Sequence, residues 1–166
     1  MDEGGVAGME TQYTWKTGLF SNRFGIFRQD FSVGELQKES IFGKVKGEMF
    51  GHGIMFRTKG IFSFNTKIVD LHNEQELGEI QFKSLKIRSI VIYSNREYHC
   101  RFENLLRTRW TLNDENGCVV SYYSRAFSGI INASTSDEVL ILAGFFIRNF
   151  LKQRSVSIAA SSCKRK

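Results

Sequence analysis

The segment Val139-Leu140-Ile141-Leu142-Ala143-Gly144-Phe145-Phe146-Ile147 is apolar at every position, and it decides the fold. It follows Thr135-Ser136-Asp137-Glu138, in which the first and last residues have the spacing of a helix capping box. Acidic residues also fall in the first turn, where the helix dipole favours negative charge. A helix that is hydrophobic on all sides has to be enclosed by other parts of the protein. We therefore predict a buried helix from about residue 136 to residue 153.

The same segment is too short to cross a membrane. From Val139 to Leu151 a helix rises about 20 Å, whereas a bilayer core of about 30 Å needs roughly 20 apolar residues. Arg148 and Asn149 also interrupt the apolar run. We therefore expect no transmembrane segment.

The residues that precede this helix have the patterns of β-strands. The chain of 166 residues contains 15 Phe, five Tyr and no Pro, which favours pleated sheet. Short segments that alternate between polar and apolar residues run from Tyr13 to Asn132, with polar breaks such as Asp114-Glu115-Asn116-Gly117 between them. We predict a mainly β fold, a closed antiparallel β-barrel of roughly 12 strands around the C-terminal helix. A β-sandwich with the helix packed on one face would show similar patterning.

The length of the chain favours a single domain, which we place at residues 11–154. The glycine-rich, acidic residues 1–10 and the small, polar, basic tail 155–166 are expected to be disordered. Three Cys without metal-ligand spacing and no recognisable signal peptide favour a reducing compartment. A cytoplasmic location is expected, with peripheral membrane association as an open question.

A faint internal repeat runs through the strand region at an offset of about 42 to 44 residues. Gly34-Glu35-Leu36 recurs as Gly78-Glu79-Ile80, and Lys44-Val45-Lys46-Gly47 recurs as Lys86-Ile87-Arg88-Ser89. Two β-meander halves that close one barrel would produce this spacing, because each half covers the open edge of the other. Chance similarity among alternating strands is the alternative.

These features resemble the tubby C-terminal domain superfamily, whose relatives include the LURP-one-related proteins and the phospholipid scramblases. Besides the Gly-Glu-Leu and Gly-Glu-Ile strand pair, the resemblance is carried by Tyr98-His99-Cys100-Arg101-Phe102, by the segment from Arg109 to Gly117, and by the closing helix. It spans Tyr13 to Gln153 and is strongest toward small bacterial tubby-like proteins of unassigned function. The resemblance implies a barrel around a central helix and a non-enzymatic role, often at phosphoinositide or other membrane lipid surfaces.

Basic side chains recur at alternating positions of the predicted strands, and the net charge is +6. In a closed barrel such side chains should point to solvent, where they could form one positive field that attracts anionic headgroups. The alternative is an ordinary solvated barrel exterior. The candidates for lipid contact are Lys44, Lys46, Lys83, Lys86, Arg88, Arg101, Arg107 and Arg109. Lys83, Lys86 and Arg88 lead this set because they cluster within a short stretch.

No catalytic or nucleotide-binding motif is present, and the histidines have no ligand spacing. His52, His72 and His99 lie in three separate segments, so we expect each to be a surface or turn residue rather than a metal ligand. The glycines between residues 43 and 53 have no Walker lysine or strand–loop–helix context. We therefore predict no enzymatic activity, no catalytic residue, no metal site, no cofactor and no nucleic-acid partner.

Two functions remain after these exclusions. The first is a binding module that docks on anionic membrane lipid headgroups through its basic surface. The second is a protein-interaction or scaffold domain with no role in lipid binding. A barrel that encloses a small apolar ligand is disfavoured because the helix should fill the lumen. The sequence does not indicate the oligomeric state.

Overall fold

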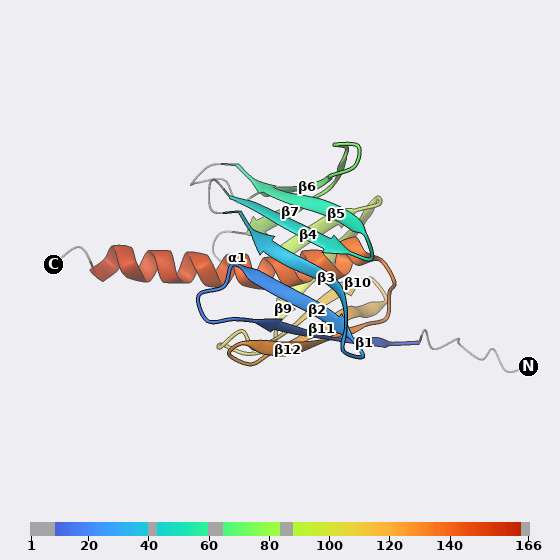
Figure 1. Ribbon diagram of the computed structural model, residues 1–166. Helices are drawn as coiled ribbons and strands as arrows, with labels where there is room; N and C mark the ends of the chain where they lie inside the picture. The colour runs from blue at the N-terminus through green and yellow to red at the C-terminus, as the bar shows by residue number, and fades with distance from the viewer. Residues whose placement is uncertain (1–8, 40–42, 60–64, 84–87, 164–166) are drawn as a thin grey trace, which may run out of the picture.

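The chain folds into a closed antiparallel barrel of twelve strands, seen in the computed structural model (Figure 1). The structure describes residues 9–39, 43–59, 65–83 and 88–163, with side chains of the last segment described to Lys152. Each strand pairs with its neighbours in the chain, and the first strand closes on the last. The strands are β1 (Thr11–Thr17), β2 (Arg23–Arg28), β3 (Phe31–Lys38), β4 (Lys44–Met49), β5 (His52–Thr58), β6 (Asn65–Asp70), β7 (Glu76–Lys83), β8 (Arg88–Tyr93), β9 (Arg96–Phe102), β10 (Arg109–Asp114), β11 (Gly117–Ser124) and β12 (Ser128–Ala133).

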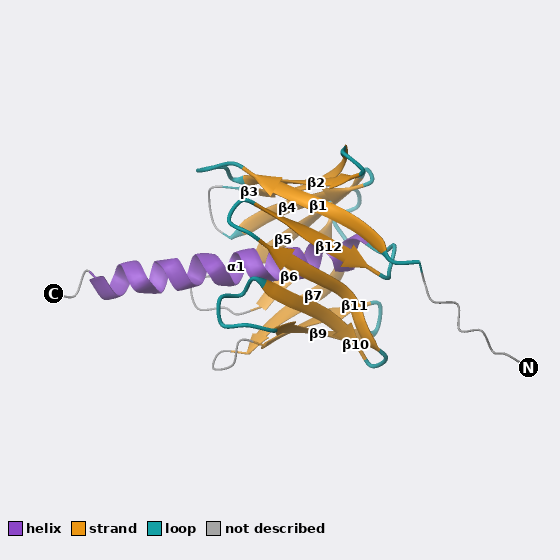
Figure 2. Cartoon of the chain, turned by 90° about the horizontal axis from the view of Figure 1, so that it is seen from below, coloured by secondary structure: helices purple, strands orange, loops and turns teal. Residues whose placement is uncertain are grey.

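One helix, α1 (Glu138–Cys163), passes through the barrel along its axis (Figure 2). Its apolar segment from Val139 to Ile147 is buried, and no side chain of that segment is more than 3% exposed. A sandwich would leave one stripe of this helix outside the sheets, so the predicted barrel around a central helix is confirmed. We call the end where α1 begins the entry mouth and the end where it leaves the exit mouth.

The described part of α1 extends beyond the predicted end at residue 153. The helix continues to Cys163, although the sequence analysis expected a disordered tail from Ser155 onward. The segment contains neither Gly nor Pro before Cys163, so no residue in it terminates the helix. Within the described part of the chain, no helix has the length and apolar character needed to cross a bilayer.

The start of α1 also differs from the predicted capping box. Asp137 caps the helix, since its Oδ1 accepts a hydrogen bond from the Val139 amide at 3.0 Å. Thr135 Oγ1 accepts from the Asp137 amide at 3.1 Å. Glu138 points to the barrel wall, where its carboxylate Oε1 lies 2.7 Å from Nδ1 of His52.

Aromatic side chains and two hydrogen bonds fix the position of α1 in the barrel. Phe146 of the helix stacks on Phe56 of β5, with ring centroids 4.4 Å apart. Trp110 Nε1 donates to the Gly144 carbonyl at 3.0 Å, and the Tyr122 hydroxyl donates to the Ile141 carbonyl at 2.8 Å. A Cβ on Gly144 would overlap the Tyr122 ring, so this close approach requires glycine.

The faint sequence repeat corresponds to a structural repeat, and the structure adds a third copy. The β2–β3 pairing skips Val33, the β6–β7 pairing skips Leu77, and the β10–β11 pairing skips Val119. Each skipped residue marks a β-bulge near the entry mouth, four strands from the next one. Its partly buried side chain packs on the core. Bulges increase strand bending and twist, which helps a sheet to close.

His52 joins two strands to the helix at the entry mouth. It is the first residue of β5, and its ring lies 3.0 Å from Asp70 at the end of β6 and 2.7 Å from Glu138 of α1. The hydrogen bonds to Asp70 and Glu138 raise the pKa of His52 above its ordinary value of 6.5. The hydrogen bond from His52 is the main cause that lowers the pKa of Asp70. His52 lies part-exposed beside the β4–β5 turn, close to the expected surface or turn position, but its contacts with Asp70 and Glu138 were not predicted.

Removal of a helix side chain that packs on the barrel wall should lower the stability of the fold. Phe146 is 1% exposed, and Phe146→Ala should lower the free energy of unfolding by about 3–5 kcal/mol through lost burial and a residual cavity. Denaturant unfolding measures this as a lower midpoint. The matched control Phe31→Ala, at a side chain that is 76% exposed, should leave the midpoint nearly unchanged. Equal effects of the two changes would contradict the central position of the helix.

The His52 contacts should give stability that depends on pH. Because folding raises the pKa of His52, its protonated ring stabilises the fold below about pH 6.5. This stabilisation is lost as the pH rises through the folded-state pKa. Because folding lowers the pKa of Asp70, its carboxylate stabilises the fold above the ordinary pKa of 3.8. This stabilisation is lost as the pH falls through the folded-state pKa. His52→Gln should therefore reduce the melting temperature most at about pH 5–6, with a smaller difference above about pH 8. The control His72→Gln, at an exposed turn residue, should show no such dependence.

Candidate functional site

The exit mouth gathers most of the basic side chains of the described residues. In an antiparallel barrel every odd strand ends and every even strand begins at the same mouth. Basic residues occupy these positions in most of the strands, and α1 adds two more as it leaves. Fourteen cations form this set, which we call the basic rim: Lys16, Arg23, Lys38, Lys44, Arg57, Lys59, Lys83, Arg88, Arg101, Arg107, Arg109, Arg125, Arg148 and Lys152. Only Glu39 and Glu103 are acidic among the described residues of this mouth.

The entry mouth has the opposite charge. Arg28 and Arg96 are its only described Arg or Lys residues. Its described carboxylates are Glu10, Asp30, Glu48, Asp70, Glu74, Glu76, Glu97, Asp114, Glu115, Asp137 and Glu138. The net charge of the chain therefore understates the field, because positive and negative charges are separated along the barrel axis.

Five of the eight large apolar side chains that are exposed among the described residues lie at the exit mouth, and the other three, Met9, Phe31 and Phe50, lie at the entry mouth. Leu19 and Phe20 lie in the loop from β1 to β2, Leu105 and Leu106 in the loop from β9 to β10, and Phe127 in the loop from β11 to β12. Phe20 is 97% exposed and Leu105 is 99% exposed. Because β1 and β12 are adjacent in the barrel, and β9 to β12 follow one another, these loops occupy one side of the mouth.

The structure distributes the predicted lipid-contact residues around the exit mouth and down the wall below it. Lys44 and Lys46 lie on β4, where they flank the buried Val45. Lys83 ends β7 and pairs directly with Arg88, which begins β8, and both are exposed. Lys86, the third member of that predicted cluster, lies outside the described residues.

The three remaining candidates differ in their environments. Arg101 is exposed on β9, and the Arg109 guanidinium lies 5.5 Å from the centre of the Tyr123 ring. Arg107 does not point freely to solvent as expected: it is half-buried, and its Nη1 donates to the Leu151 carbonyl of α1 at 3.3 Å. Arg107 therefore joins the β9–β10 loop to the helix.

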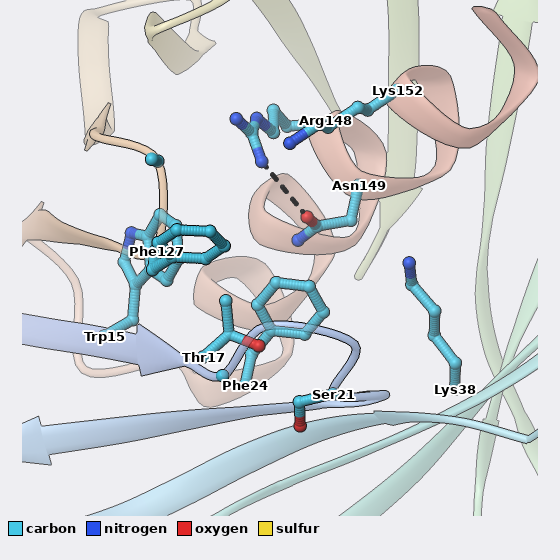
Figure 3. Close-up of a pocket in the computed structure, with 11 residues that line it drawn as sticks. Trp15, Thr17, Ser21, Phe24, Lys38, Phe127, Arg148, Asn149 and Lys152 are labelled. Atoms are coloured by element: carbon cyan, nitrogen blue, oxygen red, sulfur yellow. Dashed lines mark hydrogen bonds between the residues drawn. The ribbon is translucent and has the colours of Figure 1, made fainter. Parts of the chain in front are cut away.

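A pocket of about 410 Å³ opens within the exit mouth, between α1 and the ends of β1 to β3 (Figure 3). Three cations line it: Lys38 from β3, and Arg148 and Lys152 from one face of α1. Its other lining residues are Trp15, Thr17, Gly18, Ser21, Phe24, Ala126, Phe127 and Asn149. None of the lining residues is acidic.

Among the described residues, the cations of this pocket have no carboxylate partner. No Asp or Glu of the described residues lies within 4.0 Å of a nitrogen of Lys38, Arg148 or Lys152. Burial lowers the pKa of Lys38 first, and the charges of Lys152 and Arg148 lower it further. Burial and the charge of Arg148 likewise lower the pKa of Lys152. The three groups therefore repel one another across an open space.

Sequence analysis identified none of the three pocket cations as functional, although Arg148 carried a signal. It was recognised only as an interruption of the apolar run. The signal was present, because a cation in a helix that a barrel encloses must reach a mouth or find a buried partner. Lys38 and Lys152 carried no such signal, because their proximity depends on the position of α1 along the barrel axis.

The described residues hold no group of three or more His, Cys, Asp or Glu side chains that could bind a metal ion. Burial raises the pKa of the Cys100 thiol to about 12, so this buried cysteine stays protonated near neutral pH. The cations gathered at the exit mouth can attract anions.

Comparison with known proteins adds no relative: no family model, curated protein or solved structure matches the chain.

Proposed function

We propose that this protein is a non-enzymatic module that docks the exit mouth of its barrel on an anionic membrane surface. The observation that carries the proposal is that the basic rim and the larger group of exposed apolar loop tips lie at the same end of the molecule, whereas the exposed apolar side chains of the entry mouth lie among carboxylates. Cations attract the lipid headgroups, and apolar tips enter the boundary between headgroups and acyl chains. A surface of this composition is typical of peripheral membrane contact.

The magnitudes are sufficient for reversible binding. Each Lys or Arg near an anionic surface contributes about 1 kcal/mol, and this contribution falls off within a Debye length. Full burial of a Leu or Phe side chain contributes about 1.5–3 kcal/mol. A few cations and two or three loop tips therefore offset a substantial part of the entropy lost on association.

The charge separation also favours one orientation on the membrane. With the exit mouth toward the lipid, the acidic entry mouth is on the far side, beyond the reach of screened repulsion. With the barrel wall or the entry mouth toward the lipid, carboxylates would approach the anionic surface. The resemblance to tubby-like proteins also implies a role at lipid surfaces, which agrees with this proposal.

Charge reversal at the exit mouth should weaken binding to vesicles. Lys83→Glu with Arg88→Glu should reduce association with phosphatidylserine-containing vesicles by about tenfold or more, since four charge units change at the rim. Flotation at low and physiological salt measures this, and wild-type binding should fall as salt rises. Vesicles of phosphatidylcholine alone should bind weakly.

The matched control is Arg28→Glu with Arg96→Glu, which changes the net charge equally at the entry mouth. It should leave vesicle binding nearly intact. Equal losses for both pairs would show that net charge, rather than the exit mouth, governs association. No flotation of the wild-type protein on any charged vesicle would contradict the proposal and leave a protein partner as the alternative.

A further inference from the structure

We infer that the pocket lined by Lys38, Arg148 and Lys152 binds a phosphomonoester group. This inference deepens the proposed function, because it names the chemical group that the exit mouth recognises. It rests on that function only where the phosphomonoester belongs to a membrane lipid.

The buried guanidinium of Arg148 is the first argument. Its side chain is 7% exposed, and a charge at that depth is normally paired with an opposite charge. Arg148 instead has neutral partners: Nη2 donates to Ser124 Oγ at 2.9 Å, and Nη1 donates to Asn149 Oδ1 at 3.3 Å. These bonds leave N–H donors of the guanidinium available for an anion.

The rigid placement of Arg148 is the second argument. The guanidinium carbon lies 5.7 Å from the centre of the Trp110 ring, which stacks on Tyr122. Asn149, which accepts from Arg148, is itself fixed by donating to the Phe145 carbonyl at 2.9 Å. The barrel wall and the helix therefore hold the guanidinium in place before any ligand arrives, which lowers the entropic cost of binding.

The other two cations complete a site for more than one negative charge. Lys38 extends from β3 toward the helix face that carries Asn149 (Figure 3), and its ammonium lies 5.5 Å from the centre of the Phe24 ring. Lys152 is one helical turn beyond Arg148 on the same face of α1. Binding of a dianion would relieve the mutual repulsion among these three cations more than binding of a monoanion.

A phosphomonoester matches this site better than other common anions. It carries about −1.5 to −2 charges at neutral pH and three acceptor oxygens, whereas a phosphodiester or a carboxylate carries only one charge. Arg and Lys bind such oxygens through charge-assisted hydrogen bonds. The pocket of about 410 Å³ has room for an organic part beside the phosphate, against the apolar faces of Phe24 and Phe127.

Two sources can supply this group. One is a soluble phosphorylated metabolite, and the other is a lipid whose headgroup is a phosphomonoester, such as phosphatidic acid. Both present the same chemistry to the pocket, so the test needs one arm for each source.

The first arm measures binding of glycerol 3-phosphate to the intact protein by calorimetry. Lys38→Met and Lys152→Met should each weaken binding by about tenfold, as loss of one charge-assisted contact predicts. The control Lys46→Met, on the barrel wall, should change affinity by less than about twofold. Arg148→Met should abolish binding, and circular dichroism checks its folding. If that variant does not fold, the two lysine variants still decide the result.

The second arm compares vesicles of phosphatidic acid with vesicles of phosphatidylglycerol at matched surface charge. A preference for phosphatidic acid that Lys38→Met removes would assign the site to a lipid. Binding of glycerol 3-phosphate without such a preference would assign it to a soluble ligand.

Failure of the pocket and failure of membrane docking give different results. No glycerol 3-phosphate binding together with equal binding to both vesicles would overturn the phosphomonoester site while docking through the basic rim stands. Binding of glycerol 3-phosphate without vesicle association would overturn docking and retain the pocket.

Discussion

The enclosure of α1 by the barrel is the constraint on which the rest of the structure depends. A helix with apolar side chains on every side loses stability unless a complete wall covers it, and an antiparallel sheet provides such a wall only by closing. The wall in turn needs the helix, because twelve strands around an empty lumen would leave large aromatic side chains without packing partners. Since Trp110, Phe146 and their neighbours fill the interior, ligands must be met at the mouths or on the outer surface.

This constraint also determines where the charges meet. The direction of each strand decides whether a terminal residue lies at the entry or the exit mouth, and the threading of α1 brings Arg148 and Lys152 to the exit. The same helix therefore stabilises the core with its first turns and contributes Arg148 and Lys152 to the exit-mouth pocket with later ones. A change that shifts α1 along its axis would alter the pocket as well as the core. The hydrogen bonds of Trp110 and Tyr122 to the helix backbone oppose such a shift.

Periodicity was sufficient to predict the barrel, the central helix and the outward direction of Lys44 and Arg101. It was insufficient wherever the answer depended on residues far apart in the chain. The contacts of His52 with Asp70 and Glu138, the binding of Arg107 to α1 and the meeting of Lys38 with Arg148 all join distant segments. The separation of charge between the mouths was accessible in principle, because an up-and-down order of strands assigns every strand end to a mouth. It does not show in the alternation along any single strand, because it depends on the strand ends that meet at each mouth.

An environment-sensitive fluorophore at either mouth would report directly whether the exit mouth faces the membrane, as we propose. The label is placed on Leu105→Cys at the exit mouth or on Glu115→Cys at the entry mouth, with Cys118→Ser and Cys163→Ser in both proteins; Cys100 is buried and should not react. With phosphatidylserine-containing vesicles, we expect a blue shift of emission at residue 105 and none at residue 115. A blue shift at residue 115, or none at either position while the protein is bound, would contradict the proposed orientation.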